Sequence, residues 1–271
     1  MPEALTSAPT INEPHEGKLR AAIARKLAAW GGMARFSLRF FKEVFKPPYE
    51  WREIIRHFDD LGARSMVLIT IVNFIMGLIL AMQTRPTMVK FGAAAFIPGM
   101  VATSITRELG PVISALLVAG RVASGIGAEL GSMKVSEQID ALECIGIDPY
   151  RYLVVTRVVA MTLLMPLICL YAITIGIFGA YIAEAIAVGV TPRYFFDAVV
   201  RIVNFEDWVP SMVKCAFFGF AIAMVGAHKG FTTESGTEGV GRATTSAVVV
   251  ASLWVLLIDM VMVKLTVTWF Y

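Results

Sequence analysis

Long stretches without charge are the feature that most limits what this chain can fold into. Residues 65–84 and 158–183 contain no Asp, Glu, Lys or Arg. About 20 apolar residues in a helix cross the roughly 30 Å hydrocarbon core of a bilayer. The 271-residue chain is 57% hydrophobic and only 17% charged, whereas soluble domains are about 25% charged. The sequence therefore predicts an all-α integral membrane protein.

About five transmembrane helices are expected. Their approximate bounds are 65–84, 99–130, 158–183, 208–228 and 243–263. Residues 86–98 contain two prolines and are interpreted as a short re-entrant or interfacial piece. Lys and Arg are densest before the first span and recur in 131–157, and such positive segments favour the cytoplasmic side. An odd number of spans then places the N-terminus in the cytoplasm and the C-terminus outside.

The region before the first span has two parts. Residues 1–16 are polar and proline-containing and are expected to be disordered. Residues 17–64 are interpreted as a basic amphipathic interfacial region, because 17–46 hold eight Lys or Arg, one acid and several aromatic residues. Such a segment lies in the headgroup plane of an anionic leaflet. A nucleic-acid-binding arm is the alternative, and the hydrophobic body that follows disfavours it.

A short polar segment, residues 134–145, connects the second and third spans and is followed by a Gly-Ile-Asp-Pro break. Apolar and acidic residues recur there three apart on neighbouring faces, as Ile139, Leu142 and Ile145 and as Glu137, Asp140 and Glu143. This spacing predicts an amphipathic helix. At the cytoplasmic surface it is well placed to dock a soluble partner. An ordinary interfacial loop helix is an equally favoured alternative.

Six charged residues fall in or near the predicted spans, namely Arg107, Glu108, Arg121, Glu129, Lys214 and Asp259. A lone charge at the bilayer centre costs at least about 2.5–3.5 kcal/mol on insertion scales. These residues are therefore expected to be paired, to reach the membrane surface or to line a polar cavity. Arg107 or Lys214 could pair with Glu108 or Asp259, and arginines also suit a phosphate. Alternatively, Glu129 and Lys214 mark the ends of spans with misplaced bounds.

Small residues recur in the second and third spans as Gly127 and Gly131, and as Gly176, Gly179, Ala180 and Ala183. Small residues let two helices approach closely. The approach could lie within one subunit or between two copies.

Motifs of common catalytic and nucleotide sites are absent from the sequence. It contains no G-x-x-x-x-G-K-[ST], H-E-x-x-H or G-x-S-x-G, so ATP hydrolysis of the P-loop type is not expected from this chain. The three cysteines and three histidines lack metal-ligand spacing. A non-enzymatic protein with no metal and no cofactor of its own is expected.

Several longer motifs occur together in the chain. They are S-E-Q-I-D-A-L followed by G-I-D-P, T-R-E-L-G-P at 106–111, A-G-R at 119–121, A-E-L-G at 128–131 and G-T-E-G-V-G-R-A-T-T at 236–245. In these motifs the chain resembles the MlaE/YrbE permeases, the membrane subunits of ABC transporters that carry lipids together with MCE-domain proteins. The resemblance covers about residues 17–268. Thr156 departs from it, because the family pattern has Pro there.

The resemblance implies that residues 65–271 form the permease domain of a homodimer in the bacterial inner membrane, with the C-terminus in the periplasm. The domain would move phospholipid between that membrane and a periplasmic MCE-protein ring, toward or from the outer membrane. ATP and Mg²⁺ would be bound by a separate MlaF-like ATPase. An MlaB-like STAS protein and an MlaD-like hexameric MCE protein would complete the assembly.

The resemblance also implies roles for particular residues. Residues 134–145 would be the coupling helix, and the expected ATPase contacts are Glu137, Gln138, Ile139, Asp140 and Leu142. Charged positions of the lipid path match Arg107, Glu108, Lys214 and Asp259, to which the charge pattern adds Arg121. Acyl-chain contacts are expected, from location alone, at Ile75, Leu78 and Met82.

Two other functions are compatible with the sequence. An ion-coupled secondary carrier could use Arg121, Glu129 and Asp259. A structural membrane anchor for a soluble partner would need none of these charges. Transport by the chain alone in an ion gradient would favour the carrier, and lipid traffic that depends on Arg107 or Lys214 would count against the anchor.

Overall fold

The computed structural model describes residues 31–46, 50–233 and 236–270, and all regular structure in these ranges is helical. Five helical stretches within them are long and apolar enough to cross a membrane: Ser65–Lys90, Ala94–Val135, Tyr150–Val188, Phe205–Phe231 and Thr237–Trp269. The predicted all-α membrane architecture is confirmed. The predictions for residues 1–16, and for the part of the amphipathic region before residue 31, lie outside the described residues.

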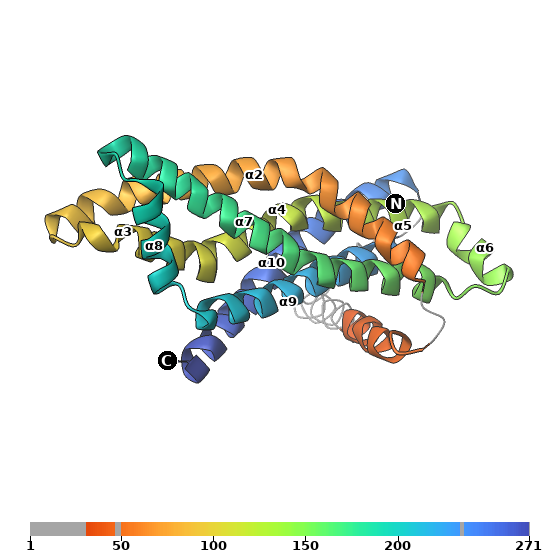
Figure 1. Cartoon of the computed structure of the whole chain (residues 1–271). Coiled ribbons are helices and arrows are strands. Elements are labelled where there is room, and N and C mark those ends of the chain that lie inside the picture. Colours follow the sequence, from red (N-terminus) through yellow and green to blue (C-terminus); the bar gives the residue numbers. More distant parts are fainter. Residues whose placement is uncertain (1–30, 47–49, 234–235, 271) are drawn as a thin grey trace, which may run out of the picture.

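The long helices run along a common direction (Figure 1). They are α2 (Trp51–Lys90), α7 (Thr156–Val188), α9 (Phe205–Phe231) and α10 (Thr237–Phe270). Helix α2 packs mainly on α7, α7 on α9, and α9 on α10. Two short helices mark opposite ends of the bundle, α6 (Gln138–Cys144) at one end and α8 (Pro192–Ile202) at the other.

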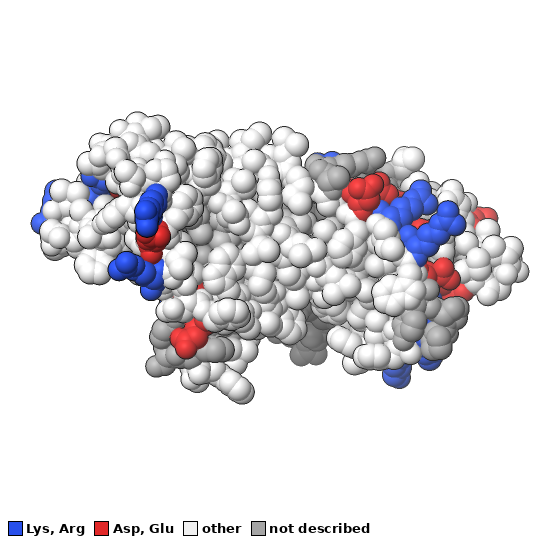
Figure 2. Space-filling view, in the orientation of Figure 1, with Lys and Arg blue, Asp and Glu red and all other residues white. Residues whose placement is uncertain are grey.

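Charged side chains on the face shown in Figure 2 gather toward these two ends, and the band between them is almost free of charge. This distribution is what a bilayer requires, since charges in the hydrocarbon layer are unfavourable. Among the spans, α10 and α2 bury the smallest shares of their residues. Their outward apolar faces are therefore available to lipid or to another protein.

The second span is a series of helical pieces rather than one regular helix. A 3₁₀ turn (Ala94–Phe96) leads into α3 (Ile97–Ser104), α4 (Gly110–Val118) and α5 (Ser124–Val135). The pieces are joined by two π-helical turns, η2 (Ile105–Leu109) and η3 (Ala119–Ala123). A third π turn, η4 (Tyr150–Val155), precedes α7. Such turns are frequent at functional sites, and here η2 contains Arg107 and Glu108 and η3 contains Arg121.

The spans are several residues longer than predicted, and two predicted segments are divided differently in the structure. Helix α2 continues through Pro86 to Lys90, so residues 86–90 belong to the first helix instead of a separate piece. Proline is tolerated inside membrane helices because neighbouring groups satisfy the carbonyl that it leaves without a donor. Helix α5 extends to Val135, and a turn at residues 136 and 137 separates it from α6, so the predicted segment 134–145 is two elements.

Glycines set the closest helix contact, between α2 and α7. A Cβ built on Gly77 would lie 1.9 Å from the Gly176 carbonyl oxygen, and one built on Gly179 would lie 2.2 Å from the Phe74 carbonyl oxygen. The small residues of the third span therefore pack against α2 of the same subunit.

Candidate functional site

Two acids of the predicted lipid path, Glu108 and Asp259, converge on Lys214. Its Nζ lies 3.0 Å from Oε2 of Glu108 and 2.8 Å from Oδ1 of Asp259. The Lys214 side chain is only 5% exposed, while that of Glu108 is 44% exposed. The three residues belong to η2, α9 and α10. Their ion pairs tie three segments of the bundle together.

The π turn η2 explains why Lys214 can bind there. Gly110 N–H donates to the Ile105 carbonyl, five residues earlier, instead of to Thr106. Pro111 has no N–H and cannot donate to the Arg107 carbonyl. The Thr106 and Arg107 carbonyls accept hydrogen bonds from α9 instead. Ser211 Oγ donates to Thr106 O at 2.7 Å, and Lys214 Nζ donates to Arg107 O at 2.7 Å. The irregular backbone thus creates the polar contacts that hold the lysine.

Arg107 pairs with Asp207 rather than with Glu108 or Asp259. Asp207 is buried in the first turn of α9, where its carboxylate also accepts from the Asn204 N–H in a capping box. Arg107, Glu108 and Lys214 line a cavity of about 250 Å³, whose remaining wall includes Val263, Thr266 and Val267 of α10. Charged and apolar groups therefore share one cavity, as an amphipathic ligand requires.

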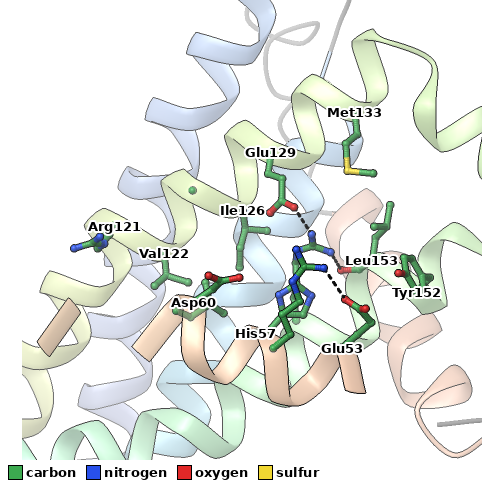
Figure 3. A pocket seen from close by; sticks show the side chains of 14 residues that line it. Glu53, His57, Asp60, Arg121, Val122, Ile126, Glu129, Met133, Tyr152 and Leu153 are labelled. Carbon is green, nitrogen blue, oxygen red and sulfur yellow. Dashed lines mark hydrogen bonds and ion pairs between the residues drawn. The ribbon is translucent and has the colours of Figure 1, made fainter. Parts of the chain in front are cut away.

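Arg121 does not join the Lys214 cluster. It lines a separate cavity of about 630 Å³ between α2, α5 and the start of α7 (Figure 3). In that cavity Glu129 pairs with Arg157 Nη2 at 2.6 Å, and Arg157 Nη1 also donates to the Leu153 carbonyl at 2.8 Å. The prediction that Arg121 shares a charge network with the other four residues is not supported by this geometry.

Sequence reasoning did not assign roles to Arg157, Asp207 or the pair Arg85 and Glu184. Arg85 Nη1 lies 2.5 Å from Glu184 Oε2 and joins α2 to α7. Each of these residues lies just outside an uncharged run, so position alone suggested an ordinary flanking charge. Asp207 had one usable signal, the Asn204 capping pattern at the start of a span.

Helix α6 lies at one end of the bundle and exposes an acidic surface (Figure 1). Ile139 is buried and Leu142 is half-buried, so these two side chains hold α6 against the bundle. Glu137, Gln138 and Asp140 are exposed, and Lys134 Nζ donates to Asp140 Oδ1 at 2.9 Å. Of the five predicted ATPase contacts, Ile139 therefore faces the bundle and three face solvent.

Glu137 has an unusual backbone conformation, with φ of 58° in the left-handed region. A non-glycine residue rarely adopts this region, and such strain tends to occur at functional sites. Here it makes the sharp turn from α5 into α6.

The segment after α6 is fastened to the N-terminal helix, residues 31–43. Arg39 Nη2 lies 3.2 Å from Asp148 Oδ1, and its guanidinium lies 4.4 Å from the Tyr150 ring centroid. The Tyr150 hydroxyl donates to the Phe36 carbonyl at 2.6 Å. The segment between α6 and α7 is thus joined to the N-terminal helix by an ion pair, a cation–π contact and a hydrogen bond.

The residues suggested for acyl-chain contact do not form one group. Ile75 and Met82 of α2 are 46% and 64% exposed on the outer surface. Leu78 instead packs against the buried cluster formed by α3, α7 and α8. Ile75 and Met82 are therefore the more accessible of the three, and Leu78 is partly buried.

His57, which precedes the first span, makes the free energy of unfolding depend on pH. Burial, followed by the charge of Arg157, lowers its pKa from 6.5 to about 4, although Glu129, Glu53 and Asp60 act in the opposite direction. The folded protein keeps this imidazole neutral, whereas the unfolded chain protonates it below about pH 6.5. The contribution of neutral His57 to the free energy of unfolding is thus fully present above pH 6.5 and is lost as pH falls toward 4.

Replacement of His57 by Gln should therefore reduce acid sensitivity. The fall in thermal unfolding midpoint between pH 7 and pH 5 should be smaller for the variant in detergent than for the unmodified chain, because Gln takes up no proton in either state. The two proteins should show parallel behaviour between pH 7 and pH 8. Equal losses on acidification would contradict the assignment.

Five membrane-crossing helices, a buried charge cluster beside a cavity and an exposed polar helix at one end define a polytopic membrane protein of the permease type. The family model described as Permease MlaE matches residues 54–265. The chain therefore belongs to the MlaE permease family, whose members are permease subunits of ABC transporters with the ATPase on a separate chain.

Named relatives agree with this family. A probable ABC transporter permease protein of Rickettsia typhi is 35% identical over 235 residues, covering 87% of this chain and 91% of the relative. The intermembrane phospholipid transport system permease protein MlaE of Haemophilus influenzae is 33% identical and covers 77% and 80%. The chloroplastic protein TRIGALACTOSYLDIACYLGLYCEROL 1 of Arabidopsis thaliana is 32% identical and covers 81% and 63%.

Proposed function

We propose that this chain is the permease subunit of an ATP-driven phospholipid transporter in the bacterial inner membrane. The observation that carries the proposal is the Lys214 cluster beside a cavity with an apolar wall, in a family whose Haemophilus member is named for phospholipid transport. Lys214 and Arg107 offer positive charge to a lipid phosphate. The apolar wall from α10 suits the start of an acyl chain.

The proposed working unit is a homodimer. The outward face of α10 exposes Leu253, Leu256 and Met260, and α2 exposes Ile75 and Met82. Two such faces can enclose a lipid chamber between two copies. The N-terminus would lie in the cytoplasm and the C-terminus in the periplasm, as the distribution of basic residues favours.

The remaining components are proposed on family grounds. An MlaF-like ATPase would bind ATP and Mg²⁺ and receive the acidic surface of α6, and an MlaB-like STAS protein would accompany it. An MlaD-like hexameric MCE protein would stand on the periplasmic side and exchange lipid with the chamber. This chain would hold no cofactor of its own.

Coupling in this proposal runs through α6 and α5. Closure of the ATPase would displace α6, which Ile139 and Leu142 attach to the bundle. Helix α5 continues through η3 and α4 to η2, where Glu108 meets Lys214. Packed helices shift between discrete arrangements, so a displacement at α6 would change the cavity near Lys214.

Reversal of charge on the acidic surface formed by α6 and the turn before it tests the coupling role. The double change Glu137→Lys with Asp140→Lys should lower ATPase co-purification and lipid-stimulated ATP turnover by about tenfold or more, because like charges would replace complementary ones at the interface. Thermal unfolding of the permease should be nearly unchanged, since both side chains are exposed.

Asp197→Lys is the control, because it replaces one exposed carboxylate by an ammonium group on α8 at the opposite end, half the charge change of the double variant. It should leave ATPase association intact. Normal association and turnover in the α6 variant would refute the coupling role.

Extraction with native lipids tests the function as a whole. Mass spectrometry of the purified particle should detect phospholipid together with an ATPase chain. Lipid transport by this chain alone, driven by an ion gradient without nucleotide, would contradict the proposal.

A further inference from the structure

The connection between α5 and α7 leaves the bundle and returns to it. Helix α5 ends at Val135, α6 occupies Gln138–Cys144, and the chain re-enters through η4. Figure 1 shows this connection projecting from one end of the bundle. It has two legs, α5 on the outgoing side and η4 with the first turn of α7 on the returning side. A displacement of α6 can therefore reach the bundle through either leg.

The two legs share little direct packing. Helix α5 packs mainly on α9 and α10, whereas α7 packs mainly on α2 and α9, and the contact between α5 and α7 is slight. Between α5, the start of α2 and the returning leg lies the cavity of about 630 Å³ shown in Figure 3. Helix packing alone therefore does not fix the separation of the two legs on the side of this cavity.

An ion pair joins the two legs across the side of this cavity. Arg157 Nη2, in the first turn of α7, lies 2.6 Å from Glu129 Oε1 of α5, and Figure 3 marks the contact as a dashed line from Glu129. Arg157 Nη1 also donates to the carbonyl of Leu153 in η4 at 2.8 Å. One guanidinium thus binds α5 and stabilises the π turn of the returning leg.

Burial distinguishes this contact from an ordinary surface ion pair. The Arg157 side chain is 5% exposed, whereas that of Glu129 is 55% exposed. An exposed pair separates at little cost because water solvates both charges. Separation here would leave a buried guanidinium without its acid, which is strongly unfavourable. The pair therefore favours one separation of the two legs.

We propose that Arg157 is a positioning residue for coupling, whose pair with Glu129 fixes the separation of the two legs so that a displacement of α6 moves α5 and α7 together. The inference rests on the proposed function, which supplies that displacement through an ATPase at α6. It goes beyond the proposed function by adding α7 as a second route into the bundle. Helix α7 packs on α9, which carries Lys214, so this route also leads to the Lys214 cavity.

Distance measurements between spin labels test the pair in the full chain without an ATPase. Labels are placed at Ser132 on α5 and at Leu163 on α7, both of which are exposed. The exposed Cys144 is changed to Ser, and the two buried cysteines are retained. Electron paramagnetic resonance in bilayer nanodiscs should give a broader distance distribution for Glu129→Ala than for the parent, because Ala removes both the charge and the acceptor that hold α5.

Two further variants assign the effect to the pair. The reciprocal exchange of Glu129→Arg with Arg157→Glu restores opposite charges and should narrow the distribution again. Glu184→Ala is the matched control, because it removes the acid of the Arg85 pair, which joins α2 and α7 at the other end of the bundle. It should leave the distribution unchanged. An unchanged distribution in Glu129→Ala, or equal broadening in the control, would overturn the inference.

The coupling role is tested in the complex with the ATPase in proteoliposomes, by the number of phospholipid molecules moved per ATP hydrolysed. Glu129→Ala should lower this ratio about fivefold, within the range for residues that connect two coupled sites. Arg157→Leu should lower it similarly and leaves no unpaired buried charge, so it serves if the Ala variant does not fold. Glu184→Ala should keep the parental ratio even if it lowers the thermal unfolding midpoint, a difference that a purely structural role of Glu129 would not produce.

The two assays separate this inference from the proposed function. Parental ratios in both Glu129→Ala and Arg157→Leu, with lipid transport intact, would overturn the inference and leave the proposed function standing. A parent complex that moves no lipid on ATP hydrolysis would contradict the proposed function. The distance measurements would then still decide whether the pair fixes the separation of the two legs.

Discussion

Replacement of Lys214 by Met should destabilise the permease by about 3–5 kcal/mol, the range seen when one partner of a buried ion pair is removed, and should abolish lipid transport. The change leaves the Glu108 and Asp259 carboxylates near each other without a cation, and it removes the donor to the Arg107 carbonyl. The site lies within membrane-spanning segments, where water cannot compensate.

A neutral triple variant separates structure from function at this site. Glu108→Gln and Asp259→Asn, added to Lys214→Met, remove the uncompensated charge and should recover most of the lost stability, measured by thermal unfolding in detergent. Lipid transport should stay absent, because the positive charge offered to the phosphate is gone. Arg193→Gln, which breaks an exposed pair with a 4.0 Å separation on α8, is the control and should be neutral. Full transport by the triple variant would contradict a role for Lys214 in the lipid path.

Replacement of Gly77 by Ala should have the second largest effect, a loss of about 3 kcal/mol of stability, at the upper end of overpacking effects. The added methyl group would lie 1.9 Å from the Gly176 carbonyl oxygen and 2.8 Å from its carbon, so α2 and α7 must move apart. Backbone atoms cannot turn aside as a side chain can. The α2 and α7 contact runs along the length of the bundle, so its separation would disturb both ends.

Gly241→Ala is the matched control for this prediction. Gly241 lies in helix α10, and no atom lies within 4 Å of a Cβ built there. Because Ala favours helix over Gly by roughly 0.5–1 kcal/mol, this variant should be as stable as the parent or slightly more stable. Thermal unfolding midpoints in the same detergent compare the two. Equal midpoints for Gly77→Ala and the parent would show that the helices can adjust at this contact.

The number and kind of elements could be predicted because hydrophobicity acts locally. An uncharged run such as 158–183 must cross a bilayer as a helix whatever its neighbours are. Boundaries were less predictable. Pro86 suggested an end to the first helix, but proline is compatible with a membrane helix and α2 continues to Lys90. An amphipathic helix within residues 134–145 could also be predicted, because its acidic and its apolar residues each recur three apart.

The partners of the buried charges could be predicted only in part. The cost of a lone charge in lipid indicated that Lys214 should be paired, reach the membrane surface or line a polar cavity. In the structure it contacts both Glu108 and Asp259. Arg107 pairs with Asp207 and Arg121 lies in a different cavity, because the π turns η2 and η3 rotate successive side chains in ways that regular helical spacing does not describe. Backbone irregularity of this kind has no simple sequence signature beyond Pro111.

By itself the sequence determined that this protein lies in a membrane, that it has about five spans and that its few embedded charges must be paired, reach the membrane surface or line a polar cavity, since each of these follows from the transfer of local groups between water and lipid. Only the tertiary structure decided which charges meet, that the glycines of α7 pack against α2, and that Arg121 lines a different cavity from Lys214. Those outcomes depend on how far helices approach and rotate against one another, and that geometry arises from packing between residues distant in the chain.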